Sequence, residues 1–329
     1  MIAEGGRSSA SGFGTGRFTA ALGLWLPVAV VIGLVAFFSI ASDSFLTLRN
    51  LTAICGQASA LLLCCLGATF VILMGSIDLS VGAMVLLVAS ITAMAINAFG
   101  LGIEATAVAI VIGTLLGLAN GLVFAYGAIP SFVVTLGSLS VFSGLAWNLL
   151  SGRSVSFDSP AFENLAIGQL IPYVPNITLF ALAAWCASIF VCYQTRFGRY
   201  MYVIGGGEAV AKTSGVPVRR YKIYAFVLSG AMAGLGGALA LARLGSAGPT
   251  LGSELLLNSL AAIVVGGTSL SGGVGGVQRT LIGVLIITVL DDGLNLIGTN
   301  QFSQTIIKGV VVIAAVLVSQ DRSKIVVMK

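Results

Sequence analysis

The sequence predicts an all-α polytopic membrane protein with about ten transmembrane helices and both termini in the cytoplasm. Of its 329 residues, 57% are hydrophobic and only 8% are charged, whereas soluble domains average about 45–50% apolar and about 25% charged residues. Apolar stretches of roughly 20 residues, the length that crosses a bilayer as a helix, recur along the chain. Glycine makes up 43 of the residues, and small residues allow membrane helices to approach closely.

The spans are expected to form a single transmembrane domain, residues 19–320. A Gly- and Ser-rich segment, residues 1–18, precedes this domain and is predicted to be a disordered cytoplasmic tail. The first span, 19–41, exceeds the roughly 7–15 apolar residues of a secretory signal, so we expect it to be retained. The other spans are expected at 51–74, 78–98, 101–126, 130–150, 172–193, 223–243, 254–270, 275–297 and 304–320, before a cytoplasmic tail at 321–329. Because several breaks between them are short, nine or eleven spans remain open.

Two long polar segments differ in charge and set the predicted topology. Residues 151–171 are mildly acidic, whereas residues 194–222 carry six Lys and Arg against one Glu. With ten spans, twelve of the 16 basic residues fall on the face that holds 194–222 and both termini. Because basic loops stay preferentially in the cytoplasm, 194–222 is predicted to be cytoplasmic and 151–171 periplasmic. Topology also accounts for the net charge of +5 without a nucleic acid partner.

Two spans carry glycine at every fourth position. Gly113, Gly117 and Gly121 share one helix face, as do Gly230 and Gly234. Such faces are typical of closely packed membrane helices. We therefore predict helix packing, with a helix hinge as the alternative.

The segment GSIDLSVGA, residues 75–83, interrupts a long apolar region with Asp78, Ser80 and Gly82. A carboxylate at membrane depth is costly, which makes Asp78 a candidate for contact with a substrate or a coupling ion. Asp is also a favoured N-cap. We favour the interpretation that Asp78 caps the next helix at the cytoplasmic boundary, and we retain a functional contact as the alternative.

Other polar side chains in the spans are candidates for lining a pathway. Asp291 and Asp292 lie near the outer end of the ninth span, where they form either an interfacial helix end or part of a polar vestibule. Asn120, Asn148 and Asn295 are placed either to face a polar cavity or to make hydrogen bonds between helices.

The composition excludes several classes of chemistry. The chain has no histidine, which removes Ser-His-Asp catalysis and His-based zinc sites. The five cysteines lie in apolar runs without CxxC spacing and are interpreted as small packed hydrophobes. The glycine-rich segment 266–276, predicted to be a tight cytoplasmic turn, lacks GxxxxGK[ST], and no Walker A motif occurs in the chain. We therefore expect neither ATP hydrolysis nor a metal or cofactor site in this polypeptide.

The basic loop 194–222 contains a short predicted helix. Glu208 to Thr213 are compatible with helix, follow Gly205 to Gly207, and precede Gly215 and Pro217, which end it. A helix of about two turns held between two spans is suited to receive force from a soluble partner. The alternative is a solvated loop whose basic residues serve only to keep it on the cytoplasmic side of the membrane.

Six motifs between about Ser44 and Ser319 carry a family resemblance. They are SFLTLRNLTAI (44–54), GSIDLSVGA (75–83), IPSFVVTLGSLSVFSGLA (129–146), RFGRYMYVIGGGEAVAKTSGV (196–216), VVGGTSLSGGVGG (264–276) and DDGLNLIG (291–298). Together they resemble the permease subunits of bacterial sugar ABC importers of the ribose/xylose/arabinose type, in the branched-chain permease superfamily. IDLSVG followed by GGTSLSGG at this separation is the specific part of the match.

The resemblance implies a multi-pass protein of the bacterial inner membrane, with ten spans around a central pathway and membrane lipid around it. It implies three partners: a cytoplasmic ATPase that binds ATP and Mg, a second permease subunit in a homodimer or heterodimer, and a periplasmic sugar-binding protein. The chain itself would then be no enzyme.

The resemblance also implies that the short helix after Gly207 couples the permease to the ATPase, through Gly207, Glu208, Ala211, Lys212, Ser214 and Gly215. Relatives usually have Asn at position 207 and Ala at position 210, where this chain has Gly207 and Val210. Relatives commonly read ELDAIAA and NNGLNL, where this chain has LLNSLAA, with Asn258, and DDGLNL. Ribose is therefore not carried over, and a polyol, a deoxy or amino sugar, or a pentose remain open.

The alternative function is an ion-coupled secondary transporter or facilitator, in which Asp78, Asp291 and Asp292 would carry protons or sodium. Against it, these carboxylates lie near predicted span ends and the two halves of the chain show no obvious internal repeat. An intramembrane enzyme is a third class, which is disfavoured by the absence of histidine, of paired membrane carboxylates of DxxxD form and of a metal cluster in the sequence.

Overall fold

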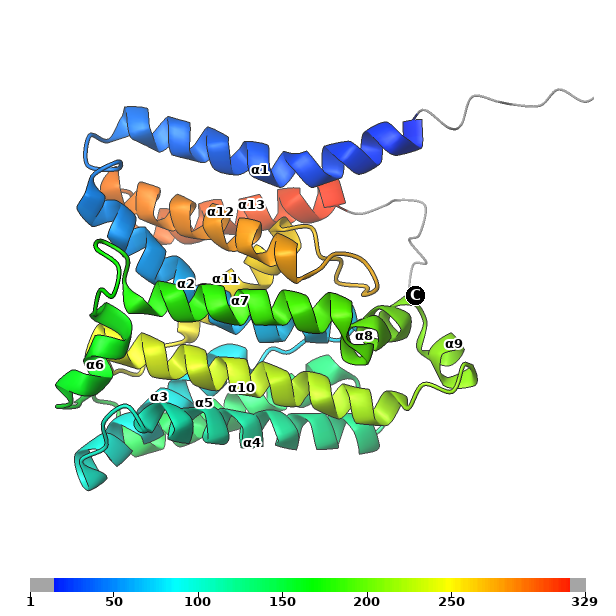
Figure 1. Cartoon of the computed structure of the whole chain (residues 1–329), viewed down its shortest axis with the longest axis horizontal. Coiled ribbons are helices and arrows are strands. Elements are labelled where there is room, and N and C mark those ends of the chain that lie inside the picture. Colours follow the sequence, from blue (N-terminus) through cyan, green and yellow to red (C-terminus); the bar gives the residue numbers. More distant parts are fainter. Residues whose placement is uncertain (1–14, 320–329) are drawn as a thin grey trace, which may run out of the picture.

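The computed structural model describes residues 15–319, which form a helical bundle (Figure 1). Two strands of two residues each, β1 (Val155–Ser156) and β2 (Ser246–Ala247), pair antiparallel. The helices are α1 (Thr15–Ala41), α2 (Leu48–Leu73), α3 (Val81–Phe99), α4 (Ala105–Tyr126), α5 (Ser131–Leu150), α6 (Pro160–Ile167), α7 (Asn176–Gln194), α8 (Arg196–Gly206), α9 (Glu208–Thr213), α10 (Val218–Leu244), α11 (Ser253–Val265), α12 (Val277–Leu296) and α13 (Gln301–Ser319).

The architecture is that of an all-α membrane protein. Six helices are long and apolar enough to cross a membrane: α2, α3, α4, α5, α7 and α10. The four other predicted spans also contain helices, but α11 has only 13 residues and α12 carries three charged side chains, Arg279, Asp291 and Asp292. Length and composition of the described helices therefore support six spans, four fewer than the sequence predicts.

Several element boundaries differ from the predictions. Helix α1 begins at Thr15, inside the predicted tail 1–18, whose remainder lies outside the described residues, as does the predicted tail 321–329. Helix α11 ends at Val265 rather than 270, because Gly267 adopts a positive φ that ends a helix. The polar segments 151–171 and 194–222 contain the helices α6 and α8, which the sequence analysis did not predict.

The other helices of the bundle are arranged around α2, a helix that is apolar on all sides. Helix α2 is buried at every residue from Ala58 to Leu73, as expected for a helix without a polar face. Figure 1 shows α1, α12 and α13 on one side of it and α3, α4, α5 and α10 on the other. Helix α6 lies at one end of the bundle, and α8 and α9 lie at the opposite end, together with the start of α1 and the end of α13.

The cysteines divide into two groups. Cys64, Cys65 and Cys192 are buried, which agrees with their interpretation as small packed hydrophobes. Cys55 and Cys186 are exposed in this chain, so that interpretation was wrong for them. Whether a cysteine is buried depends on the face of its helix on which it lies, and the sequence alone did not reveal these faces.

The two glycine faces pack against each other, which confirms the packing prediction. A Cβ atom added to Gly230 on α10 would lie 2.8 Å from the Cα of Gly117 on α4, and one added to Gly113 would lie 2.8 Å from the Cα of Gly234. These distances leave no room for any side chain. Because these glycines have no side chains, the backbones of α4 and α10 can come into contact.

Candidate functional site

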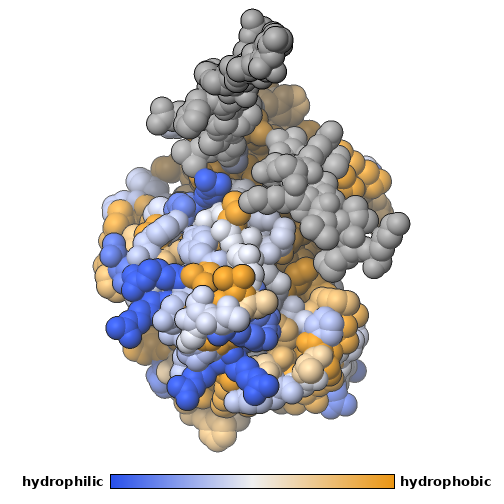
Figure 2. All heavy atoms as spheres, turned by 90° about the vertical axis from the view of Figure 1, so that its right-hand side faces the viewer, coloured by the Kyte–Doolittle hydropathy of each residue, from blue (hydrophilic) through white to orange (hydrophobic). Residues whose placement is uncertain are grey.

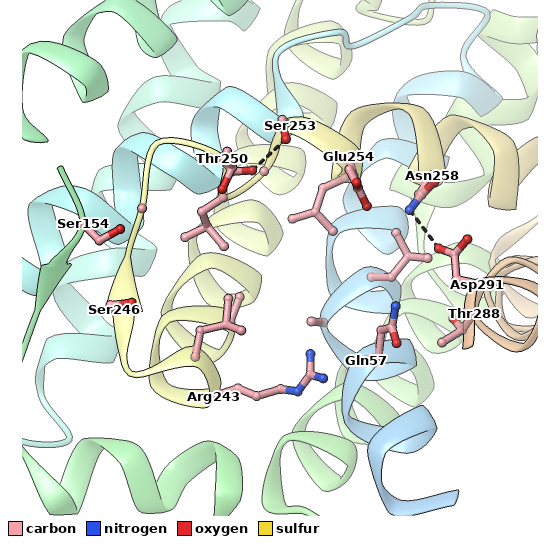
Figure 3. A pocket seen from close by; sticks show the side chains of 18 of the residues that line it. Gln57, Ser154, Arg243, Ser246, Thr250, Ser253, Glu254, Asn258, Thr288 and Asp291 are labelled. Carbon is pink, nitrogen blue, oxygen red and sulfur yellow. Dashed lines mark hydrogen bonds between the residues drawn. The ribbon is translucent and has the colours of Figure 1, made fainter. Parts of the chain in front are cut away.

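A polar cavity of about 850 Å³ lies at the end of the bundle that carries α6, since its wall includes β2, the partner of β1. Helices α2, α10, α11 and α12 contribute the other walls. Figure 3 shows their polar side chains around the cavity, namely Gln57, Arg243, Glu254, Asn258, Thr288 and Asp291. The cavity therefore combines polar and apolar side chains in its lining, between largely apolar helices.

Helix α11 supplies the acceptor groups of one wall. It begins after Gly252, which has a positive φ of 88°, and this turn places Glu254 in the first helical turn. Because Asn258 follows four residues later, both side chains lie on the same helix face. Gln301 Nε2 donates a hydrogen bond to Glu254 Oε1 at 3.0 Å, and Asn258 Nδ2 donates to Asp291 Oδ2 at 3.3 Å.

Asp291 lies in the wall of the polar cavity. Its Oδ1 is 3.0 Å from Nζ of Lys308 on α13, and the two side chains are only 7% and 11% exposed. A buried carboxylate needs such a partner. Its neighbour Asp292 does not line the cavity and instead accepts a hydrogen bond of 2.7 Å from Asn50 Nδ2.

Sequence reasoning missed Arg243, Gln57, Glu254 and Thr288 as residues of this cavity. Arg243 offered a signal, because it is the lone charge of the apolar run ALALARL. A charge in the last turn of a span is ordinarily interfacial, which is why the pattern alone did not select it. Gln57 and Thr288 carry no comparable signal.

Asp78 lies apart from the polar cavity, in a buried cluster of hydroxyl and amide groups. Its side chain is 2% exposed. Its Oδ1 accepts hydrogen bonds from the N–H of Ser80 at 3.0 Å and the hydroxyl of Ser80 at 2.6 Å, and its Oδ2 accepts one from Ser229 on α10 at 3.0 Å. The bond to the Ser80 N–H resembles the predicted cap, but Asp78 lies inside the bundle and not at its boundary. Since Ser229 is eleven residues into α10, the α2–α3 turn reaches into the bundle.

Asn120 belongs to the same cluster and makes hydrogen bonds between helices, which is one of the two alternatives that the sequence left open for it. Its Nδ2 donates to Ser80 Oγ at 2.8 Å, and its Oδ1 accepts from the hydroxyl of Ser138 on α5 at 2.5 Å. Gly82, at the start of α3, faces the backbone of Gly252, where a Cβ atom would collide with a carbonyl group. These two predicted residues therefore hold helices together in the structure and do not line the polar cavity.

We expect the Asp78 cluster to contribute strongly to stability. Replacing Asp78 by leucine leaves the donors of Ser80 and Ser229 without an acceptor, and each unsatisfied buried group costs about 1–3 kcal/mol. Asp78→Asn retains one acceptor oxygen and should lose less. Thermal unfolding of the purified protein in detergent measures both variants. Equal midpoints for Asp78→Leu and the unchanged protein would contradict this assignment.

The remaining predicted asparagines lie outside the polar cavity. Asn148 is exposed on α5. Asn295 is exposed near the end of α12, where its Oδ1 accepts a hydrogen bond of 2.7 Å from Gln304 Nε2. Of the predicted pathway residues, the cavity therefore brings together only Asn258 and Asp291.

The predicted short helix is α9, with the predicted bounds Glu208–Thr213. Ala211 is fully buried and anchors it, while Lys212 and Ser214 are exposed and Gly207 is half-buried. Glu208 pairs with Lys212 at 2.7 Å and with Lys222 of α10 at 2.9 Å. Burial raises the pKa of Glu208, but the two lysines outweigh it and hold the pKa below its usual range. The pairs are therefore intact at neutral pH and are lost only as the pH falls through this lowered pKa.

A junction of glycines connects the base of α9 to two turns. Gly205, in α8, meets Gly272 and Gly273 of the segment 266–276, and Gly272 meets Gly75 of the α2–α3 turn. A Cβ atom on Gly205 would lie 2.5 Å from the N atom of Gly273, and the Gly273 N–H donates to the carbonyl of Leu73 at 2.9 Å. Three chain segments thus touch through backbone atoms.

The end of the bundle with α8 and α9 is rich in hydrophilic residues, as Figure 2 shows. Basic side chains that are exposed there include Lys212, Arg219 and Arg220. Val210 of α9 is 67% exposed in their midst. This end therefore combines a positively charged surface with an exposed apolar side chain on a protruding helix.

Comparison with known proteins places the chain among transport proteins. Residues 50–316 match the model of a family described as the branched-chain amino acid transport system permease component. The ribose import permease protein of Escherichia coli (strain K12) is 36% identical over 296 residues, which cover 88% of this chain and 91% of that protein. The ribose import permease protein of Bacillus subtilis (strain 168) is 38% identical, with 92% of each chain covered. The D-allose transport system permease protein of E. coli (strain K12) is 33% identical, with 92% of each covered. No solved structure gives a significant match.

Proposed function

We propose that this chain, which belongs to the family of branched-chain amino acid transport system permease components, provides a pathway that carries a sugar or sugar-like solute into the cell. The chain is the inner-membrane permease subunit of an ATP-driven importer and not an enzyme, since a separate subunit hydrolyses ATP. The observation that carries the proposal is the similarity, over nearly the whole chain, to permeases named for ribose and D-allose. The polar cavity supports it.

The topology that we propose has ten spans and both termini in the cytoplasm. In support, a helix occupies each of the ten predicted stretches, including α1, α11, α12 and α13, which are not among the six candidate spans. The start of α1 and the end of α13 lie at the same end of the bundle as α9 (Figure 1). Because that end carries the basic loop 194–222, it faces the cytoplasm by the positive-inside rule. The polar cavity then lies at the periplasmic end.

Helix α9 is the proposed contact with the ATPase, through Gly207, Glu208, Ala211, Lys212, Ser214 and Gly215. Its exposed Val210 offers an apolar anchor, and such a side chain suits a cleft on a partner. Through the glycine junction, movement of α9 and α8 reaches the α2–α3 turn, where Asp78 is bound to Ser229 of α10. This is a short route from nucleotide-driven motion to the helices around the pathway.

The assembly that we propose contains two permease subunits, either identical or related, a cytoplasmic ATPase that binds ATP and Mg, and a periplasmic binding protein. The binding protein supplies affinity, so the pathway needs only weak contacts with the solute. A wide polar cavity without a closed ligand site fits this division.

The energy source distinguishes this function from an ion-coupled transporter. The test uses proteoliposomes that contain the complete system in a known orientation. We expect vanadate, which inhibits the ATPase, to abolish uptake, whereas a protonophore should leave uptake unchanged. The ion pair between Asp291 and Lys308 supports the same expectation, because a carboxylate that is already paired is not free to carry a proton or a sodium ion. Uptake that survives vanadate and stops with the protonophore would contradict the proposal. Purification under mild detergent is the companion test, since a stoichiometric ATPase should accompany the chain.

A further inference from the structure

Two side chains in the polar cavity are donors without an acceptor. Arg243, in the last turn of α10, and Gln57, on α2, both project into the cavity (Figure 3). Within residues 15–319, no carboxylate or carbonyl oxygen forms a hydrogen bond or ion pair with the guanidinium of Arg243 or the amide of Gln57. An arginine is rarely placed between membrane helices without a function.

The structure makes room for Arg243. A Cβ atom added to Gly56 on α2 would lie 3.3 Å from its Nε, so the side chain lies across the glycine. An added Cβ would require the flexible Arg243 side chain to shift by a few tenths of an ångström. Gly56 therefore leaves room for Arg243 in the cavity that Gln57, one residue further along α2, also lines.

The opposite wall presents acceptors. Glu254 on α11 has one carboxylate oxygen bound to Gln301 and extends toward the cavity (Figure 3). Asn258 uses its amide N–H toward Asp291, which leaves its carbonyl oxygen to accept. The lining of the cavity also includes the apolar side chains of Ala60, Leu61 and Ala240.

The charges of the cavity cancel. Arg243 opposes Glu254 across the chamber, and Asp291 in the wall is neutralised by Lys308 behind it. A solute with a net charge would therefore gain little from the cavity as a whole. A hydroxyl group both donates and accepts hydrogen bonds, and an uncharged solute with several hydroxyls satisfies both walls while its C–H groups face the apolar side chains.

We propose that Arg243 and Gln57 contact the transported solute and, with Glu254 opposite, select an uncharged polyhydroxylated molecule. The inference rests on the proposed function, because it assumes that the polar cavity belongs to the pathway. Charge-assisted hydrogen bonds to Arg243 and Glu254 are the stronger contacts. Gln57 contributes a neutral donor that orients the solute between them.

The test compares ATP-dependent uptake by the complete importer in proteoliposomes, with four probes: D-ribose, D-allose, D-glucuronate and D-glucosamine. We expect uptake of neutral sugars only, reduced about tenfold or more by Arg243→Gln and partly restored in Arg243→Lys. Both variants should still assemble with the ATPase, which co-purification in mild detergent checks. Arg49→Gln is the matched control, because Arg49 is an exposed arginine in the first turn of α2.

A double variant separates solute contact from charge balance. If Arg243 and Glu254 only balance each other, Arg243→Gln combined with Glu254→Gln should recover uptake. If both contact the solute, the double variant should transport no better than either single one. Recovery in the double variant, full uptake by Arg243→Gln, or uptake of a charged probe at the rate of the neutral ones would overturn the inference while leaving the importer function intact. Uptake of a neutral probe that proceeds equally well without ATP would contradict the proposed function itself, and the inference would fall with it.

Discussion

Gly230→Leu is expected to prevent the formation of the folded permease. A side chain at this position has to occupy space that the backbone of Gly117 and the carbonyl of Gly113 already fill. Overpacking of side chains against side chains typically costs about 1–3 kcal/mol. Here the obstacle is the main chain of α4 and cannot rotate away, so α4 and α10 must separate along their length. The measurement is the yield of monodisperse protein in gel filtration after extraction in mild detergent.

Gly137 supplies the matched control for this experiment. It lies in a membrane helix, α5, and a Cβ atom added there meets no atom within 4 Å. Gly137→Leu should therefore give the same yield as the unchanged protein. A normal yield for Gly230→Leu would mean that α4 and α10 are not in backbone contact in the membrane.

Gly215→Pro and Glu208→Arg are expected to reduce uptake to background while the protein still inserts into the membrane. Gly215 has a φ of +80°, which proline cannot adopt because its ring fixes φ near −65°. Glu208→Arg places a third positive charge between Lys212 and Lys222 in place of their shared acidic partner. Either change should misplace α9. ATP hydrolysis by the assembled complex, with and without the binding protein, then measures the loss of coupling.

The controls separate the position of α9 from its chemistry. Gly215→Asn should transport nearly normally, because asparagine tolerates a positive φ and no atom lies within 4 Å of a Cβ at this position. Lys212→Gln removes an exposed ion pair within α9, worth about 0.3–0.5 kcal/mol, and leaves the backbone position of α9 unchanged. A loss of uptake in this variant would therefore report on the chemistry of the contact with the ATPase. Coupled uptake by Gly215→Pro would argue against α9 as the contact with the ATPase.

Two parts of the structure were predictable from local sequence. The bounds of α9 follow from flanking residues, since Gly205 to Gly207 precede it and Gly215 and Pro217 follow it. The close packing of one face of α4 and one face of α10 follows from glycine at every fourth position, whereas their pairing with each other was not predicted. In both cases the signal lies within one helix or turn, and so no knowledge of distant neighbours was needed.

The polar cavity was predictable only in part. Asn258 was selected because it departs from the family motif, and Asp291 because it is a carboxylate near the end of a span, and both line the cavity. Asn148 was selected as an amide side chain in a span and is exposed on α5. A polar residue on a membrane helix gives no information on its direction when the helix is apolar around its whole circumference, because no face is then marked as buried.

The sequence by itself determined the class of this protein: its composition requires a membrane, its motifs belong to a permease family, and its glycines specify close helix contacts. Only the tertiary structure decided which polar groups meet. Asp78 and Ser229 are 151 positions apart, and so their hydrogen bond depends on how the α2–α3 turn enters the bundle. Arg243 and Gln57 face one cavity because α10 and α2 pack with Gly56 between them. Such pairings arise from the rotation and depth of whole helices, which the local pattern of a single helix does not fix.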